Sequence, residues 1–277
     1  MNDMAHPLND NPTFSDKLNA LQSAKKSMLC VGIDPELAKI PQRFANDKDW
    51  LFKFCHVMIK STMQYAVAYK FNFAFFEAHA AFGWETLKRL REIVPADCIS
   101  IADAKRGDIG NSAGQYAKAI FEHLGFDAVT VNPYMGYDAV EPFLADPQKG
   151  AYCLCLTSNP GAKDLQYLPV DDKPIYLHVA DLVQKWGTAR NCGIVVGATR
   201  PSKLKEICQH HPNLPLLVPG VGAQGGSLGT VLDIVNGTNA LITVSRSIIY
   251  ASANDDFAQA AAHAAATMQA RMAQYFS

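Results

Sequence analysis

The segment from Cys98 to Ser112 places charged side chains at the point where an apolar strand ends. It reads Cys-Ile-Ser-Ile-Ala-Asp-Ala-Lys-Arg-Gly-Asp-Ile-Gly-Asn-Ser, and residues 98–102 predict a strand that is buried on both faces. Because side chains alternate along a strand, Asp103 and Lys105 project to the same side. A carboxylate beside an ammonium group is either a structural ion pair in a turn or a pair that can handle charge and protons.

A second carboxylate, Asp108, follows Lys105 after two intervening residues. Gly107 and Gly110 break the strand, and we expect them to let the loop turn Asp108 back towards Lys105. Opposite charges within a few ångströms favour the charged form of a lysine, so the two acids keep Lys105 protonated. A protonated lysine is a poor Schiff-base nucleophile but a good cation and proton donor.

Length and composition restrict the class of protein. The 277 residues, of which 49% are hydrophobic and 18% are charged, suffice for one α/β-barrel domain or for two smaller domains. A net charge of −1 gives no global field for nucleic acid, so local groups must hold any anionic ligand. The seven cysteines, with no C-x-x-C pair, are typical of buried thiols in a reducing compartment and predict no metal site. With neither a signal peptide nor an apolar run of 18 residues, we expect a cytoplasmic protein that is not bound to a membrane.

Strand-like and helix-like segments alternate along the whole chain, which predicts a (β/α)8 barrel formed by a single α/β domain over residues 1–277. Residues 1–13 are expected to be a loose extension, followed by a helix from Phe14 with Ser15 as its N-cap. Residues 164–172 are expected to form a loop, and Asn254 to cap the last helix. The predicted strands are 28–33, 68–76, 98–102, 128–132, 151–157, 192–197, 214–218 and 240–245. The later predicted helices are 50–67, 84–94, 111–124, 140–144, 176–187, 204–210 and 255–276.

Several of these strands end in polar residues, and the C-terminal ends of barrel strands meet at one mouth. Lys70 lies inside the second strand, and because an unpaired buried lysine is costly, we expect it to face Asp103 of the next strand. Asn72 has the same parity and is expected to line the mouth as well. Asp34 precedes a proline at the end of the first strand, and its ordinary interpretation is that it forms a turn.

The loop after the seventh strand is rich in glycine. It runs from Pro219 to Ser227 and has four glycines in seven residues, which lets backbone N–H groups approach an anion. Phosphate sites of eight-stranded barrels lie in the loops after strands 7 and 8, and the eighth strand ends at Arg246, a planar cation suited to phosphate. Ser158 and Asn159 follow the fifth strand, where turn residues are the default interpretation.

The run Asp103-Ala-Lys105-Arg-Gly-Asp108-Ile109-Gly resembles the D-x-K-x-x-D-I signature of orotidine 5′-phosphate decarboxylases. The form with Arg-Gly between Lys105 and Asp108, together with Thr-Ser-Asn-Pro at residues 157–160, resembles the long bacterial, type 2 subgroup. The resemblance extends from Phe14 to Ser247. It implies a cytoplasmic lyase of pyrimidine biosynthesis that converts orotidine 5′-phosphate to uridine 5′-phosphate and carbon dioxide without a cofactor or a metal.

The resemblance also implies the roles of individual residues. Lys105 stabilises and protonates the carbanion, while Asp103 holds Lys105 in place. Lys70 bridges the catalytic aspartate and the ribose. The remaining implied contacts with the nucleotide are Asp34 to the ribose, Ser158 to the pyrimidine amide edge with Asn159 beside it, and Gln224 and Arg246 to the phosphate, with Pro219 and Gly225 in the same loop.

A homodimer is implied too. In the family, the residues that match Asp108, Ile109 and Ser112 reach into the site of the neighbouring subunit. This chain has serine at position 112, where many relatives have threonine. The contact with the ribose that the resemblance implies for Ser112 is therefore the least secure of the implied contacts.

Three other functions fit parts of the pattern. A magnesium-dependent sugar-phosphate decarboxylase shares Asp103, Lys105 and Asp108 but has no need of Ser158 and Asn159. A Schiff-base aldolase on the same fold would use an unprotonated lysine, which the flanking acids disfavour. A nucleotide-binding protein without activity would bind uridine phosphates and release them unchanged.

Overall fold

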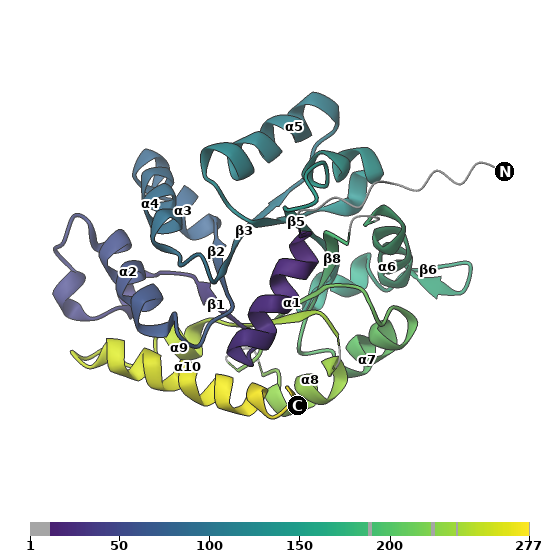
Figure 1. Cartoon of the computed structure of the whole chain (residues 1–277). Helices are drawn as coiled ribbons and strands as arrows, with labels where there is room; N and C mark the ends of the chain where they lie inside the picture. The colour runs from purple at the N-terminus through teal and green to yellow at the C-terminus, as the bar shows by residue number, and fades with distance from the viewer. Residues whose placement is uncertain (1–11, 188–189, 223–224, 237, 277) are drawn as a thin grey trace.

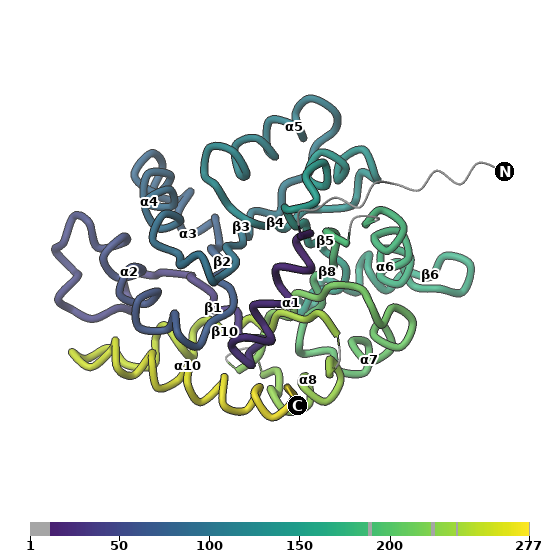
Figure 2. The backbone as a smooth tube through the Cα atoms, viewed as in Figure 1, coloured from purple at the N-terminus to yellow at the C-terminus, as the bar shows by residue number. Residues whose placement is uncertain are grey.

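Eight parallel strands close into a barrel in the computed structural model, which describes residues 12–187, 190–222, 225–236 and 238–276. Hydrogen-bonded neighbours follow the order β1-β10-β9-β8-β5-β4-β3-β2. In Figure 2 the strand labels run from β10 through β1, β2, β3, β4 and β5 to β8 around α1. The predicted (β/α)8 fold is therefore confirmed. The barrel strands are β1 (Leu29–Ile33), β2 (Ala68–Asn72), β3 (Ile99–Arg106), β4 (Ala128–Val131), β5 (Gly150–Leu156), β8 (Cys192–Val196), β9 (Leu216–Pro219) and β10 (Ala240–Val244).

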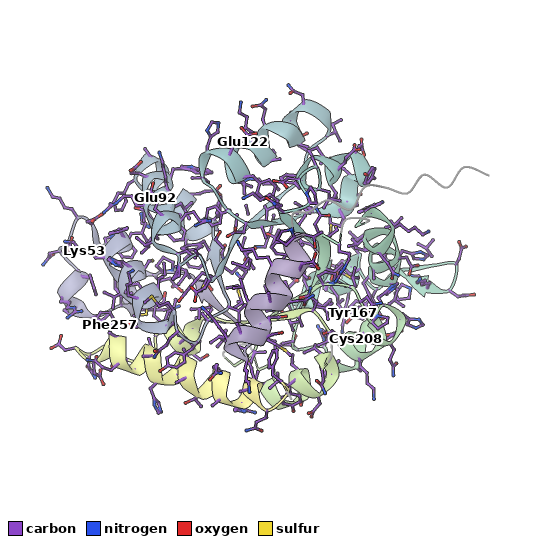
Figure 3. The ribbon with its side chains drawn as sticks, viewed as in Figure 1. Lys53, Glu92, Glu122, Tyr167, Cys208 and Phe257 are labelled. Carbon is purple, nitrogen blue, oxygen red and sulfur yellow. The ribbon has the colours of Figure 1, made fainter. Side chains whose placement is uncertain are left out.

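Helices surround the barrel, while α1 lies across the middle of the ring in the view of Figure 1. Figure 3 shows Lys53, Glu92 and Glu122 projecting away from the barrel. No helix in the described ranges is long and apolar enough to cross a membrane. The helices are α1 (Phe14–Lys25), α2 (Trp50–Thr62), α3 (Ala74–Glu77), α4 (Ala80–Ile93), α5 (Gly110–Lys118), α6 (Ile175–Trp186), α7 (Pro201–His210), α8 (Leu228–Val235), α9 (Arg246–Ile249) and α10 (Phe257–Ala273).

Helix α1 closes the N-terminal end of the barrel. Phe14 and Leu18 belong to the same apolar cluster as the interior residue Tyr152, and the rings of Phe14 and Tyr152 meet edge to face at 6.1 Å. A Cβ atom at Gly150 would lie 2.6 Å from the Phe14 ring, so only glycine fits there. Because this end is filled, the C-terminal mouth is the end left for a ligand.

Two predicted helix caps are wrong. Thr13, not Ser15, caps α1: its hydroxyl accepts from the Asp16 amide at 3.3 Å, and the Asp16 carboxylate accepts from the Thr13 amide at 3.1 Å. The Ser15 hydroxyl instead donates to the Arg190 carbonyl. Thr13 thus belongs to the fold, although we expected residues 1–13 to be loose; residues 1–11 lie outside the described residues. At the other end, α10 begins after Asp256 rather than after Asn254.

Several helices and strands end at other residues than predicted, because aromatic and polar residues obscure the periodic pattern of hydrophobic residues. The second strand stops at Asn72, and residues 74–77 form α3, whose Glu77 amide donates to the Phe73 carbonyl. The third strand runs on to Arg106. Helix α2 ends at Thr62, five residues before the predicted end at Val67.

The connections on either side of β5 also differ from the prediction. After β4, three short 3-10 turns at 133–135, 137–139 and 141–143 replace the single short helix that we expected at 140–144. The predicted loop at 164–172 includes β6 (Pro169–Val170), which pairs with β7 (Lys173–Pro174) in a small antiparallel hairpin. Neither change alters the order of the barrel strands.

Asp127 connects α1 to the barrel, and its contribution to the stability of the fold can be measured. Its carboxylate accepts from the Ser100 amide at 2.9 Å and the Ser100 hydroxyl at 2.6 Å, and lies 3.0 Å from the Lys17 ammonium. Burial by itself would raise the pKa of Asp127, but the bonds from Ser100 and the nearby cations outweigh it and lower the pKa. We expect Asp127→Ala to reduce the free energy of unfolding by about 3 kcal/mol at pH 7, because it leaves buried donors unpaired.

This contribution depends on pH in a defined direction. Because the folded-state pKa is lowered, the contribution is fully present above the unfolded value of about 3.9 and is lost as pH falls through the folded value. Urea unfolding at pH 7 and in the acid range measures it, with Asp97→Ala as control, since the Asp97 side chain is 63% exposed in its ion pair with Lys25 at 3.1 Å. Equal losses for both variants at pH 7 would contradict the role given to Asp127.

Candidate active site

The C-terminal ends of the strands surround a cavity of about 250 Å³. Charged, polar and apolar side chains from separate strands line it, together with the loop that follows β9. Of the residues singled out from the sequence, those that line the cavity are Asp34, Lys70, Asn72, Asp103, Lys105, Ser158, Pro219 and Arg246.

Two lysines that line this cavity share one carboxylate. The Lys70 ammonium lies 2.5 Å from Oδ2 of Asp103, and the Lys105 ammonium lies 2.6 Å from Oδ1. Lys70 faces Ile101 in the strand register rather than Asp103, but its side chain reaches the carboxylate as predicted. Lys70 and Asp103 are buried, whereas the Lys105 side chain is 48% exposed. Lys105 is thus the cation that a ligand can reach.

The neighbouring charges set the protonation states of the buried pair. Burial alone would raise the pKa of Asp103, but Lys70 and Lys105 outweigh it and hold that pKa well below its usual range. Burial alone would lower the pKa of Lys70, but Asp103 and Asp34 outweigh it and raise that pKa above its ordinary value. At neutral pH the site therefore holds a carboxylate next to a buried ammonium group.

Asp34 presents an unused oxygen at the mouth. Its Oδ2 accepts from the Ser245 hydroxyl at 2.5 Å, and its backbone carbonyl accepts from the Tyr250 hydroxyl at 2.6 Å. Its Oδ1 is buried and has no hydrogen-bond partner among the described residues. Ser245 fits because the facing residue is Gly32, where a Cβ atom would lie 2.2 Å from the Ser245 oxygen. An acceptor held in this way suits a ligand hydroxyl.

A cation and a glycine-rich loop also line the cavity, after the neighbouring strands β10 and β9. Arg246 is exposed, begins α9, and forms no salt bridge with the described residues. In the facing loop, Gly220 and Val221 line the cavity, and Gly220, Gly222 and Gly225 have φ values of 99°, 78° and 90°. Residues other than glycine rarely adopt these backbone angles. The predicted phosphate contact Gln224 lies outside the described residues, and Gly225 is not among the residues that line the cavity.

The loop after β3 does not turn back as expected. The Asp108 carboxylate accepts from the Ile109 amide at 2.8 Å and is not part of the cavity lining. The expectation that Asp108 flanks Lys105 within one chain is therefore wrong. β3 continues to Arg106 and α5 begins at Gly110, so residues 107–109 lead directly into the helix, and the salt bridge of Lys105 in the described structure is to Asp103.

Three other predicted residues also lie away from the cavity of this chain. Ile109 is 55% exposed, and Ser112 is exposed on α5. Asn159 is exposed and accepts a hydrogen bond from the Thr157 hydroxyl at 2.6 Å. In the described part of the chain, no group of three His, Cys, Asp or Glu side chains is placed to hold a metal ion.

Three hydroxyl groups of the cavity were not among the predicted site residues. Thr130, Thr243 and Ser245 line it, and each belongs to or directly follows an otherwise apolar strand. Thr130 donates to Oδ1 of Asp103 at 3.0 Å. A polar residue inside an apolar run was the available signal, the same signal that identified Lys70.

Comparisons with known proteins agree on one family. The family model described as orotidine 5′-phosphate decarboxylase / HUMPS family matches residues 27–263. The chain is 49% identical over 254 residues to the orotidine 5′-phosphate decarboxylase of Christiangramia forsetii, covering 90% of this chain and 93% of that protein. It is 46% identical over 250 residues to the enzyme of the same name from Herpetosiphon aurantiacus, with coverage of 90% and 93%.

Solved structures give the same result. The OMP decarboxylase of Leishmania donovani superposes with a TM-score of 0.79 at 39% identity, covering 93% of this chain and 98% of that one. The putative orotidine-monophosphate decarboxylase of Toxoplasma gondii superposes with a TM-score of 0.84 at 35% identity, with coverage of 95% and 99%.

Proposed function

The chain belongs to the orotidine 5′-phosphate decarboxylase / HUMPS family and is a decarboxylase of pyrimidine biosynthesis, and on this basis we propose how its side chains convert orotidine 5′-phosphate to uridine 5′-phosphate and carbon dioxide. The observation that carries the proposal is the array of Lys70, Asp103 and Lys105 in one cavity with Arg246. This arrangement supplies a cation for the reacting carbon and a separate cation for the phosphate.

Lys105 carries the chemical step. Breaking the bond to the carboxylate leaves its electron pair on a pyrimidine ring carbon that has no adjacent carbonyl to delocalise it. The Lys105 ammonium stabilises this charge and then donates its proton, so that a C–H bond replaces the C–C bond. Lys105 is left neutral and regains a proton from water. These side chains require no cofactor for the step.

Asp103 and Lys70 place Lys105 for this step. Oδ1 of Asp103 holds the Lys105 ammonium, while Lys70 holds Oδ2. Since Asp103 accepts from both sides, it cannot rotate without losing a charge-assisted hydrogen bond. The ionised Asp103 also lies where it crowds the carboxylate of the substrate, although the weight of such ground-state stress is disputed in general.

The rest of the nucleotide is bound away from the bond that breaks. We assign the free oxygen of Asp34 to the ribose, Ser158 to the pyrimidine, and Arg246 with Gln224 to the phosphate. Pro219 and the glycines after it bring backbone N–H groups close to the phosphate oxygens. Binding energy from these remote contacts can serve to close and dehydrate the site.

Analysis of the products tests this proposal. Incubation of the purified protein with orotidine 5′-phosphate should yield uridine 5′-phosphate and carbon dioxide in equal amounts. A sugar-phosphate decarboxylase would instead consume a keto-sugar phosphate and only with magnesium, and an aldolase would be trapped covalently by borohydride. Either result, or binding of uridine 5′-phosphate without turnover of the substrate, would contradict the proposed reaction.

A homodimer explains why Asp108 and Ile109 lie outside the cavity of their own chain. Exposed apolar side chains gather on the loops at this edge: Tyr134 is 78% exposed and Met135 is 45% exposed. A Cβ atom at Gly107 would lie 3.8 Å from Met135, so these loops adjoin the loop that carries Asp108. We propose that this edge packs against a second copy, so that Asp108, Ile109 and Ser112 enter the partner's site.

Mixing two inactive variants tests this arrangement. Lys105→Ala and Asp108→Ala should each be inactive alone, but a heterodimer contains one site with both native residues. Random reassociation should therefore restore about a quarter of the wild-type activity, because about half of the dimers are mixed and each has one intact site. If the two residues acted within one chain, mixing the variants would restore nothing.

We also propose that the protein works in the cytoplasm. All seven cysteines are present as free thiols, and six of them are buried. Buried thiols without disulfides are typical of a reducing compartment.

A further inference from the structure

We propose that Thr130 is a positioning residue whose single hydroxyl fixes both the backbone of Lys105 and the carboxylate of Asp103. This inference rests on the proposed function, because it concerns the same reaction. Thr130 lies in β4, is 1% exposed and lines the cavity.

The pairing of β3 with β4 is irregular at this residue. Ala102 pairs with Val129 and Arg106 pairs with Val131, so three residues of β3, 103–105, lie opposite Thr130 alone. The pairing of β3 with β2 remains regular up to Asp103, which pairs with Asn72. The additional residues of β3 therefore disturb only its pairing with β4, where the ladder of backbone hydrogen bonds is interrupted.

At this irregularity the backbone of Lys105 has an unusual conformation. Its φ is +49°, in the left-handed region that a residue with a Cβ atom rarely adopts. Such a conformation is costly and persists only where the surroundings hold it in place. The Lys105 amide does not join the β ladder but donates to the Thr130 hydroxyl at 3.0 Å.

The chemistry of its partners fixes the direction of both hydrogen bonds made by Thr130. A backbone amide can only donate, so the hydroxyl accepts from Lys105. An ionised carboxylate can only accept, so the same hydroxyl donates its proton to Oδ1 of Asp103 at 3.0 Å. The Lys105 ammonium also bonds to this oxygen, at 2.6 Å. One hydroxyl thus connects the backbone of Lys105 to the atom that holds its ammonium group.

Removing the hydroxyl while keeping the side-chain shape isolates this role. Thr130→Val leaves the Lys105 amide without its acceptor and Asp103 with one donor fewer. We expect kcat for orotidine 5′-phosphate to fall about 10- to 100-fold. The dissociation constant for uridine 5′-phosphate should change less than about threefold, because the assigned nucleotide contacts are untouched. Thr130→Ser, which keeps the hydroxyl, should retain kcat within about threefold of the wild type.

The control is Thr86→Val. Thr86 is also fully buried, but its hydroxyl donates to the Phe82 carbonyl within α4 at 2.8 Å, away from the cavity. This variant should keep the wild-type kcat. A crystal structure of Thr130→Val should show Lys105 leaving the left-handed region. If Thr130→Val does not fold, Thr130→Ala is measured against the same criteria.

The inference is overturned if Thr130→Val keeps the wild-type kcat, or if Thr130→Ser loses as much activity as Thr130→Val. It is also overturned if the affinity for uridine 5′-phosphate falls as far as kcat, since general damage to the site would then account for the loss. These outcomes require an active wild type. A wild-type protein that leaves orotidine 5′-phosphate unchanged would contradict the proposed function itself, so the two failures are distinguishable.

Discussion

Lys105→Ala is expected to lower kcat for orotidine 5′-phosphate by at least about 10⁴-fold. A positioned general acid contributes about 10²- to 10⁴-fold, and a preorganised charge at the reacting atom contributes a further factor of about 10² to 10³. Lys105 serves both purposes in the proposed mechanism. Because Asp34 and Arg246 remain in place, the dissociation constant for uridine 5′-phosphate should stay within about tenfold of the wild type.

Steady-state kinetics and calorimetry with uridine 5′-phosphate separate the two effects. Lys60→Ala is a suitable control, since Lys60 is exposed on α2 and does not line the cavity. It should behave like the wild type. A Lys105→Ala protein that retained its full rate would show that another group supplies the proton and the charge.

Arg246→Ala is expected to have the second largest effect, and on binding rather than chemistry. The guanidinium is exposed at the cavity, where it can form two parallel hydrogen bonds to phosphate oxygens. Its loss should lower kcat/KM by about 10²- to 10³-fold and weaken the binding of uridine 5′-phosphate by a similar factor. The affinity for uridine, which has no phosphate, should remain unchanged.

Calorimetry with the nucleotide and the nucleoside measures this difference. Arg246→Lys keeps the charge but not the planar fork, and should lie between the wild type and Arg246→Ala. Arg271→Ala, at an exposed position on α10, is the control. Equal losses of affinity for uridine and for its phosphate would show that Arg246 supports the fold of the mouth rather than the phosphate.

Much of the fold could be predicted because buried parallel strands are simple in sequence. Apolar runs separated by helical segments indicated eight strands, and the structure closes eight strands into the barrel. The contact between Lys70 and Asp103 could be predicted for a related reason. A lysine inside an apolar strand must find a carboxylate, and the available one was at the end of the next strand.

The missed features depend on contacts that hydrophobic periodicity does not encode. The predicted turn of Asp108 towards Lys105 is wrong because the length of β3 cannot be read from residues that face a polar cavity. Thr130 and Ser245 are not predicted as site residues because a single hydroxyl in or beside a strand is compatible with an ordinary buried residue. The left-handed backbone of Lys105 depends on an irregular pairing with β4, which arises only in the folded barrel.

The most direct test of the central claim is whether the side chains of this chain decarboxylate orotidine 5′-phosphate without a metal. The rate at which the substrate loses its absorbance should be measured for the wild type before and after treatment with a strong chelator, with Lys105→Ala measured in the same buffer. We predict equal rates for the wild type in both conditions and none detectable for Lys105→Ala. A wild-type rate that disappears with the chelator and returns with magnesium would contradict the claim.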